Sequence, residues 1–111
     1  MLQYLDIDKT QIPLSMLIVV EEEQYEFVFN YNSLFDFFTV TLIKDEVEII
    51  TGEKVLLDKV LFTMLPYPFK NTYFIPMDLS DKADRITFDN FGTSVFIYMF
   101  KLDEGGEPIN E

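Results

Sequence analysis

The alternation of apolar and polar residues with a period of two is the feature that most constrains the fold of this chain. The clearest case is residues 24–30, where the aromatic residues Tyr25, Phe27 and Phe29 fall at alternate positions. Successive side chains of a strand point to opposite faces of a sheet, so this pattern predicts a half-buried β-strand. A helical period is not convincing anywhere in the chain, so we expect little helix.

Segments rich in β-branched and aromatic residues recur along the chain, separated by charged, polar or proline-containing turns. Polar connections follow the first and the third of these segments, and each therefore predicts a hairpin. The first segment could also form a helical turn, but its Ile18, Val19 and Val20 favour a strand. Pro76 places its own strand at a sheet edge or a strand end, because proline cannot donate to a ladder. The expected strands span residues 14–20, 24–30, 37–43, 47–51, 54–57, 60–65, 73–77 and 93–102.

About seven or eight short strands predict an all-β fold, a small and mainly antiparallel barrel or sandwich. The length of 111 residues fits one domain, which we place at residues 1–102. Residues 103–111 contain two glycines, one proline and four acids but no base, a composition typical of a disordered tail. For the acidic residues 78–89 we expect a loop with one helical turn at residues 80–84, capped by Ser80.

Twelve Phe and six Tyr residues supply much of the apolar bulk, and most of them should fill the core. The segment at residues 94–100 is apolar on both of its faces. Either this strand is central and covered twice, or one face meets another subunit. The residues that we expect in the core are Phe27, Phe29, Val40, Leu42, Ile49, Leu56, Phe96 and Tyr98.

The chain has no His and no Cys, which removes the side chains most often used as general base or nucleophile near neutral pH. No spacing among its 20 acids singles out a catalytic pair, and its four glycines form no phosphate-binding loop. A calcium loop starting at Asp78 would need a glycine at its sixth position, where Ala83 stands. We therefore expect no enzymatic activity, no metal and no cofactor.

The formal net charge of −12 restricts the partners of the protein. Nucleic acid and anionic membrane surfaces would be repelled, whereas a basic protein would be attracted. The same charge would also keep an aromatic-rich protein soluble, and that reading stays open. The absence of cysteine fits a reducing interior, and the first residues have neither the basic region nor the long apolar stretch of a signal peptide. These features favour the cytosol of the producing cell.

Short motifs follow one another in a set order over residues 12–100: Ile12-Pro13-Leu14, Tyr25 to Asn32, Phe37 to Leu42, Gly52 to Leu57, Leu61, Pro66 and Phe91 to Tyr98. This order resembles that of the small baseplate plug proteins of contractile-tailed phages, a family described from a cyanophage baseplate. The chain departs from the family at two points: Phe37 or Phe38 stands where many members have a tryptophan, and Tyr67 follows Pro66 where many have a glycine.

The resemblance implies a structural, plug-like component of a phage or prophage tail baseplate, located in the virion after assembly in the host cytoplasm. Its partners would be baseplate hub or tail-tube proteins, and self-association into a homo-oligomer is an open alternative. Independently of the resemblance, we take Tyr67 and Phe69, in a proline-rich loop, as candidate contact residues.

The competing function is a small β-barrel module that binds an apolar ligand or a sugar. A deep pocket lined by aromatic residues would favour the binding module. A filled interior with apolar rings on the outside would favour assembly.

Overall fold

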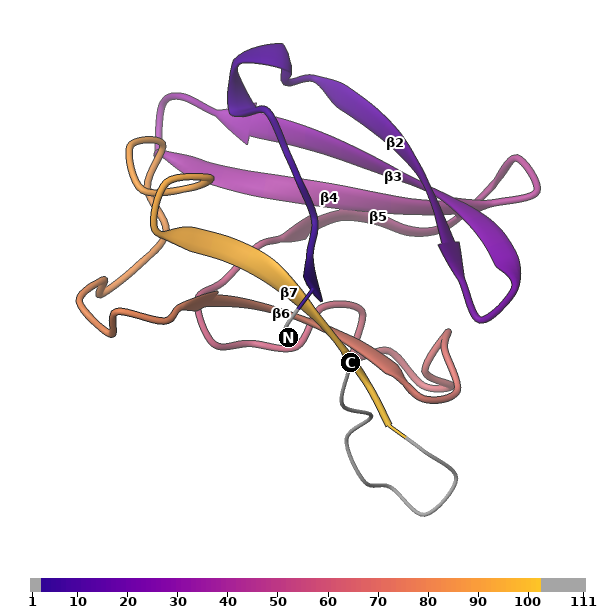
Figure 1. The fold of residues 1–111 in the computed structure, drawn as a ribbon. Coiled ribbons are helices and arrows are strands. Elements are labelled where there is room, and N and C mark those ends of the chain that lie inside the picture. Colours follow the sequence, from indigo (N-terminus) through magenta and orange to yellow (C-terminus); the bar gives the residue numbers. More distant parts are fainter. Residues whose placement is uncertain (1–2, 103–111) are drawn as a thin grey trace.

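A computed structural model describes residues 3–102 as two antiparallel sheets that face each other (Figure 1). The four-stranded sheet has the order β2-β3-β4-β5, and the three-stranded sheet has the order β1-β7-β6. This arrangement confirms the all-β prediction and is a sandwich, not a closed barrel. The elements are β1 (Gln3–Tyr4), the 3₁₀ helix η1 (Lys9–Gln11), β2 (Leu14–Val20), β3 (Glu23–Asn32), β4 (Phe37–Lys44), β5 (Val47–Lys54), β6 (Thr72–Asp78) and β7 (Val95–Lys101).

Two tight hairpins build the four-stranded sheet, as predicted. The turn between β2 and β3 holds Glu21 and Glu22 at φ values of 53° and 70°, and that between β4 and β5 holds Asp45 and Glu46 at 51° and 66°. Positive φ at both central positions is the mark of a type I′ turn, whose twist matches that of the flanking strands. The acids therefore occupy positions that glycine or asparagine usually takes.

Residues far apart in the sequence build the three-stranded sheet, in which β7 pairs with β1 on one side and with β6 on the other. The edge position predicted for the strand with Pro76 is confirmed. The Pro76 carbonyl accepts a hydrogen bond from the Asp58 amide, away from β7. The nitrogen of a strand residue points to the same side as its carbonyl, so the missing N–H of Pro76 removes no ladder bond.

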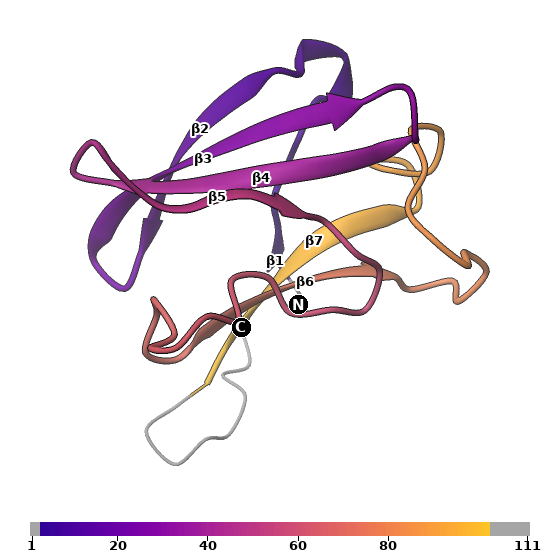
Figure 2. The ribbon, with the colours of Figure 1, turned by 180° about the vertical axis from the view of Figure 1, so that it is seen from behind.

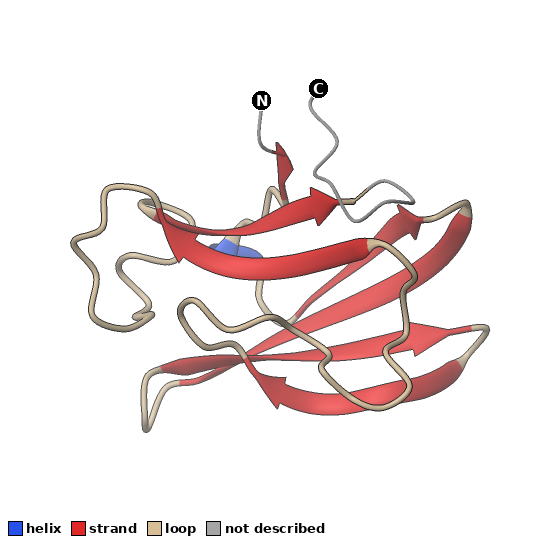
Figure 3. Ribbon diagram, turned by 90° about the horizontal axis from the view of Figure 1, so that it is seen from below, coloured by secondary structure: helices blue, strands red, loops and turns tan. Residues whose placement is uncertain are grey.

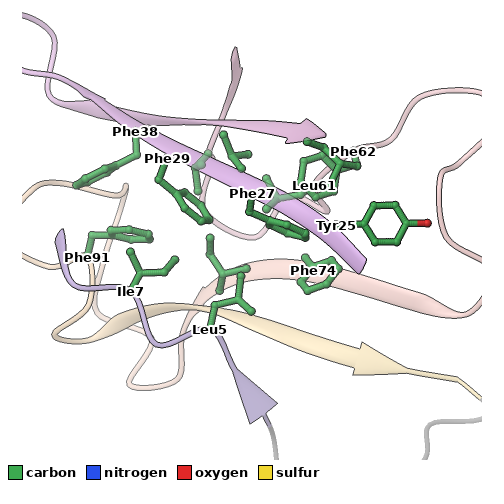
Figure 4. Packing of buried hydrophobic residues seen from close by; sticks show 14 of the residues in the cluster. Leu5, Ile7, Tyr25, Phe27, Phe29, Phe38, Leu61, Phe62, Phe74 and Phe91 are labelled. Carbon is green, nitrogen blue, oxygen red and sulfur yellow. The ribbon is translucent and has the colours of Figure 1, made fainter. Parts of the chain in front are cut away.

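The two sheets lie in two layers (Figure 3), and the core between them is made largely of phenylalanine rings (Figure 4). Phe27 of β3 and Phe74 of β6 are fully buried, with ring centroids 5.3 Å apart across the sandwich. The connections close the open sides of the sandwich, because Phe62 and Phe91 also insert into this layer. Of the predicted core residues, Phe27, Phe29, Val40 and Leu42 lie in this core, whereas Tyr98 is buried on the outer side of β7.

Two predicted strands, at residues 54–57 and 60–65, are wrong. The chain does not turn at Gly52 and Glu53; β5 continues to Lys54 with an irregular register. Residues 55–71 then form a long connection that runs beside β6 (Figure 2). Leu56 lies in that connection and is 45% exposed, so its predicted core position is also wrong.

Two further predictions need correction, and a third cannot be compared with the described residues. Ile49 and Phe96 are only partly buried; Ile49 packs against the core, whereas Phe96 lies on the outer side of β7. The helical turn predicted at residues 80–84 is absent; Ser80 does not cap a helix but donates to the Asp78 carboxylate. The tail predicted at residues 103–111 lies outside the described residues.

Candidate protein-contact surfaces

The outer face of the three-stranded sheet carries apolar side chains on all three strands. Val95 and Ile97 of β7 are fully buried against the core, so the residues that alternate with them point outward. Residues directly opposite each other on neighbouring strands share a face of the sheet. The register therefore places on one surface, here called the aromatic face, the side chains of Tyr4, Tyr73, Ile75, Met77, Phe96, Tyr98 and Phe100.

The rings of the aromatic face pack on one another. The Tyr4 ring centroid lies 4.6 Å from that of Phe96 and 5.9 Å from that of Tyr98. This packing leaves Tyr98 only 6% exposed, whereas Tyr4 remains 50% exposed at the surface. Strand β7 is thus central in its sheet, yet only its inner face lies against the other sheet. We therefore take the aromatic face as a candidate interaction site.

The two predicted contact residues lie close to each other but differ in exposure. Phe69 is only 4% exposed, and its ring packs in the core within 5.5 Å of the Phe74 ring. Tyr67 is half-buried, stacks on Tyr73 at 5.1 Å and donates its hydroxyl to the Thr72 carbonyl at 2.9 Å. Burial raises the pKa of Tyr67, so the hydroxyl stays protonated and keeps this bond. Partner contact through these two residues stays a prediction, and Tyr67 borders the aromatic face.

The Glu21 carboxylate joins the β2–β3 turn to the start of β6. It accepts hydrogen bonds from the Lys70 amide at 2.8 Å, the Asn71 amide at 2.6 Å and the Thr72 hydroxyl at 3.0 Å. Partial burial raises the pKa of Glu21, but these hydrogen bonds outweigh it, so the net pKa lies below its ordinary value. The carboxylate is thus a link between the two sheets and compensates for the positive φ of Glu21.

The Asp36 carboxylate makes a similar link at the other end of the sandwich. It accepts from the Tyr31 hydroxyl at 2.7 Å, the Phe88 amide at 2.9 Å and the Arg85 guanidinium at 2.9 Å. The hydrogen bond from Tyr31 is the main reason why the pKa of Asp36 is lowered. These donors attach the connection between β6 and β7 to the four-stranded sheet.

The geometry gives little support to catalysis or metal binding by the carboxyl groups. A catalytic pair of carboxyl groups needs one member with a raised pKa. In residues 3–102, every carboxyl group with a shifted pKa has it lowered, and hydrogen bonds, chiefly from Ser80, bring that of Asp78 to about 2. The Asp78 oxygens already accept from the Ser80, Lys82 and Ala83 amides. The same residues contain no group of three side chains suited to hold a metal ion.

The interior of the sandwich is filled, which argues against the small binding module. Phe27, Phe29, Phe38, Phe62 and Phe74 have no exposed surface and occupy the space that a ligand would need. A surface hollow of about 200 Å³ lies beside β4 and β5, where it is lined by apolar and charged side chains together. Apolar rings therefore occupy both the interior and the outer face of one sheet. Among the described residues no helix is long and apolar enough to cross a membrane.

Comparison with known protein families shows the family of this chain. A protein-family model described as "Cyanophage baseplate Pam3 plug gp18" matches residues 2–103, a span that contains both sheets and the whole aromatic face. A search of curated proteins finds no match.

Proposed function

Because the chain belongs to the cyanophage baseplate plug family, we propose that it is a structural component of a phage or prophage tail baseplate that acts through protein–protein contacts. The single observation that carries this proposal is the family match over residues 2–103. We propose the baseplate hub and the tail-tube proteins as its partners, and the virion tail as its location after assembly in the host cytoplasm.

The geometry supports a function by contact in preference to catalysis. The aromatic face presents apolar rings to solvent on a rigid sheet, and burying such rings is a main source of affinity in protein interfaces. The carboxylates with shifted pKa values serve as hydrogen-bond acceptors that hold loops in place. We therefore infer that the protein is not an enzyme and that the aromatic face is its main contact surface.

The net charge of −12 adds a condition on the partner. A strongly acidic protein associates fastest with a basic surface, and this steering weakens as salt increases. We infer that the partner surface around the aromatic face is basic, and that neither nucleic acid nor a membrane is the target.

Co-purification with the hub and tail-tube proteins encoded in the same genome tests the proposal. The wild-type chain should form a complex with at least one of them that survives gel filtration. Tyr4→Thr combined with Phe100→Thr should weaken that complex at least about tenfold, because it removes two rings from the aromatic face. Val28→Thr, on the outer face of the four-stranded sheet, is the matched control and should leave binding unchanged.

Two results would contradict the proposal. One is a wild-type chain that binds none of these proteins and is absent from purified tails. The other is equal binding by the wild type and by a double variant whose thermal unfolding shows that it is folded. That result would mean that the aromatic face is not the contact surface.

A further inference from the structure

Within residues 3–102, three of the four sheet edges are protected against pairing with another strand. The edge of β6 is covered, because the Asp58 and Leu61 amides donate to its Pro76 and Phe74 carbonyls. The edge at β1 is only two residues long. The edge at β5 has an irregular register and carries charged residues. Covering, short length, irregularity and charge are the usual devices that prevent edge pairing.

Strand β2 (Leu14–Val20) forms the fourth edge and has none of these devices. Its seven residues contain no charge and no proline, and they pair with β3 in one unbroken register. Leu17 and Val19 point outward and are 68% and 67% exposed. Among residues 3–102, the backbone of β2 makes hydrogen bonds only with β3. An uncharged, apolar edge of seven residues with a regular register is a template for one more strand.

Acidic residues gather at one end of this edge. The turns β2–β3 and β4–β5 lie at the same end of the four-stranded sheet (Figure 1). A shallow hollow there is lined by apolar Leu17 and Ile43 together with Glu26, Asp45 and Glu46. Glu21 and Glu22 of the β2–β3 turn and Glu23 at the start of β3 add further acids. Glu23 pairs with Lys44 at 3.4 Å, and Lys101 lines a second hollow beside Val19, Glu21 and Glu22, so acids outnumber lysines here. The free edge therefore ends in a region of negative charge.

We propose that β2 is a strand-addition site that takes an extended segment of a partner protein, with apolar residues along the strand and lysine or arginine at one end. Backbone hydrogen bonds to the free side of β2 would supply affinity. Leu17 and Val19 would pack against alternate side chains of the added strand, and the acidic turns would attract its basic end. This inference adds to the proposed function, because it says that the partner binds through an extended segment. Its evidence is the free edge of β2 alone.

Charge argues against two other occupants. A second copy of the chain would bring another net charge of −12 to the same edge. The segment of residues 103–111 carries four acids and no base, so the acidic turns would repel it. A basic strand from another protein is the occupant that the charges favour.

The test uses the purified, isotope-labelled chain and a synthetic peptide of about nine residues, in which two lysines precede alternating valine and threonine. Amide hydrogen exchange with and without the peptide shows which strand gains protection. We expect new protection on β2 and none on β5. A version with glutamates in place of the lysines should bind at least about tenfold more weakly at low salt, and the difference should close near about 0.5 M salt.

Val19→Lys and Val47→Lys form a matched pair of variants. The two valines are 67% and 63% exposed and lie on the two opposite edges of the same sheet. Val19→Lys should weaken peptide binding at least about tenfold, because a lysine on an edge opposes strand pairing, whereas Val47→Lys should leave binding unchanged.

Four results would overturn the proposal: no protection of β2 at saturating peptide, protection of β5 instead, equal effects of the two lysine variants, or pairing of β2 with a second copy that the peptide does not displace. Each can occur while the chain still co-purifies with baseplate proteins, so failure here differs from failure of the proposed function.

Discussion

The two sheets of this protein are made in different ways and present different surfaces. Neighbouring segments joined by tight turns build the four-stranded sheet, and its outer face mixes polar side chains such as Glu26, Thr39 and Thr41 with scattered apolar ones. Distant segments build the three-stranded sheet, and its outer face is aromatic. We infer that the four-stranded sheet provides a locally stabilised frame, while the three-stranded sheet carries the proposed contact surface.

The largest effect should come from the inner face of the three-stranded sheet. Phe74 is fully buried and its ring lies near those of Phe27, Phe62 and Phe69. Phe74→Ala should lower the free energy of unfolding by about 3–5 kcal/mol, because it removes a buried ring and leaves a cavity. Urea denaturation measures the change, and Phe74→Leu, with a smaller loss, keeps the comparison available if the alanine variant does not fold.

Phe96→Ala makes the same chemical change on the outer face and is the matched control. It should lower the free energy of unfolding by only roughly 1–2 kcal/mol, since Phe96 is partly exposed and packs mainly on Tyr4 and Tyr98. Equal losses for Phe74→Ala and Phe96→Ala would mean that the aromatic face is a second core and not a contact surface.

A middle-sized effect is expected at the link between the sheets. Glu21→Gln should lower the free energy of unfolding by about 1 kcal/mol at pH 7, because the amide has one oxygen and cannot accept on both sides as the two carboxylate oxygens of Glu21 do. The value is modest because the carboxylate is largely exposed.

The sign of the pH dependence at Glu21 follows from its lowered pKa. The stabilisation is fully present above the ordinary pKa of 4.5 and is lost as the pH falls below that value through the folded-state pKa. The difference between wild type and Glu21→Gln should therefore shrink in acid. Thermal unfolding of both proteins at several pH values measures it, and a constant difference from neutral pH into acid would rule out a charged link.

The smallest effect should be a gain in stability, at a turn of the four-stranded sheet. Glu46 has a φ of 66°, a conformation that costs a non-glycine residue about 1–2 kcal/mol. Glu46→Gly relieves this strain but makes the unfolded chain more flexible, so we expect a net gain of roughly 0.5 kcal/mol in calorimetry. The control Gln24→Gly, within β3, should lower stability; a loss in both variants would contradict the hairpin account.

The sequence was most informative where structure depends on near neighbours. The hairpin of β2 and β3 follows from alternation on both sides of a short charged turn, and both strands were located closely. The strand predicted at residues 60–65 is wrong, because an apolar run of this length is typical of a strand but also occurs in a buried connection. In the structure Phe62 has a φ of 65°, which lies outside regular strand geometry. It enters the core from a connection whose path depends on distant contacts.

The candidate surface was only partly visible in the sequence. The apolar pattern on both faces of residues 94–100 indicated either double coverage or an interface, and the pattern alone could not separate them. Tyr4 and Met77 join Phe96 on one face only through strand pairing across most of the chain. Tyr67 and Phe69 were predicted as contact residues because they lie in a proline-rich loop. The exposure of a ring in a loop depends on packing, however, and the Phe69 ring is buried in the core.

Hydroxyl-radical footprinting of the aromatic face, in the purified chain and in assembled tails, tests the central claim most directly. Tyr4 is half exposed in the isolated chain and should react readily there. In assembled tails, Tyr4, Phe96 and Phe100 should lose most of that reactivity, while the exposed Leu79 outside the face keeps its own. Equal labelling of Tyr4, Phe96 and Phe100 in the free chain and in tails would contradict a contact function for this face.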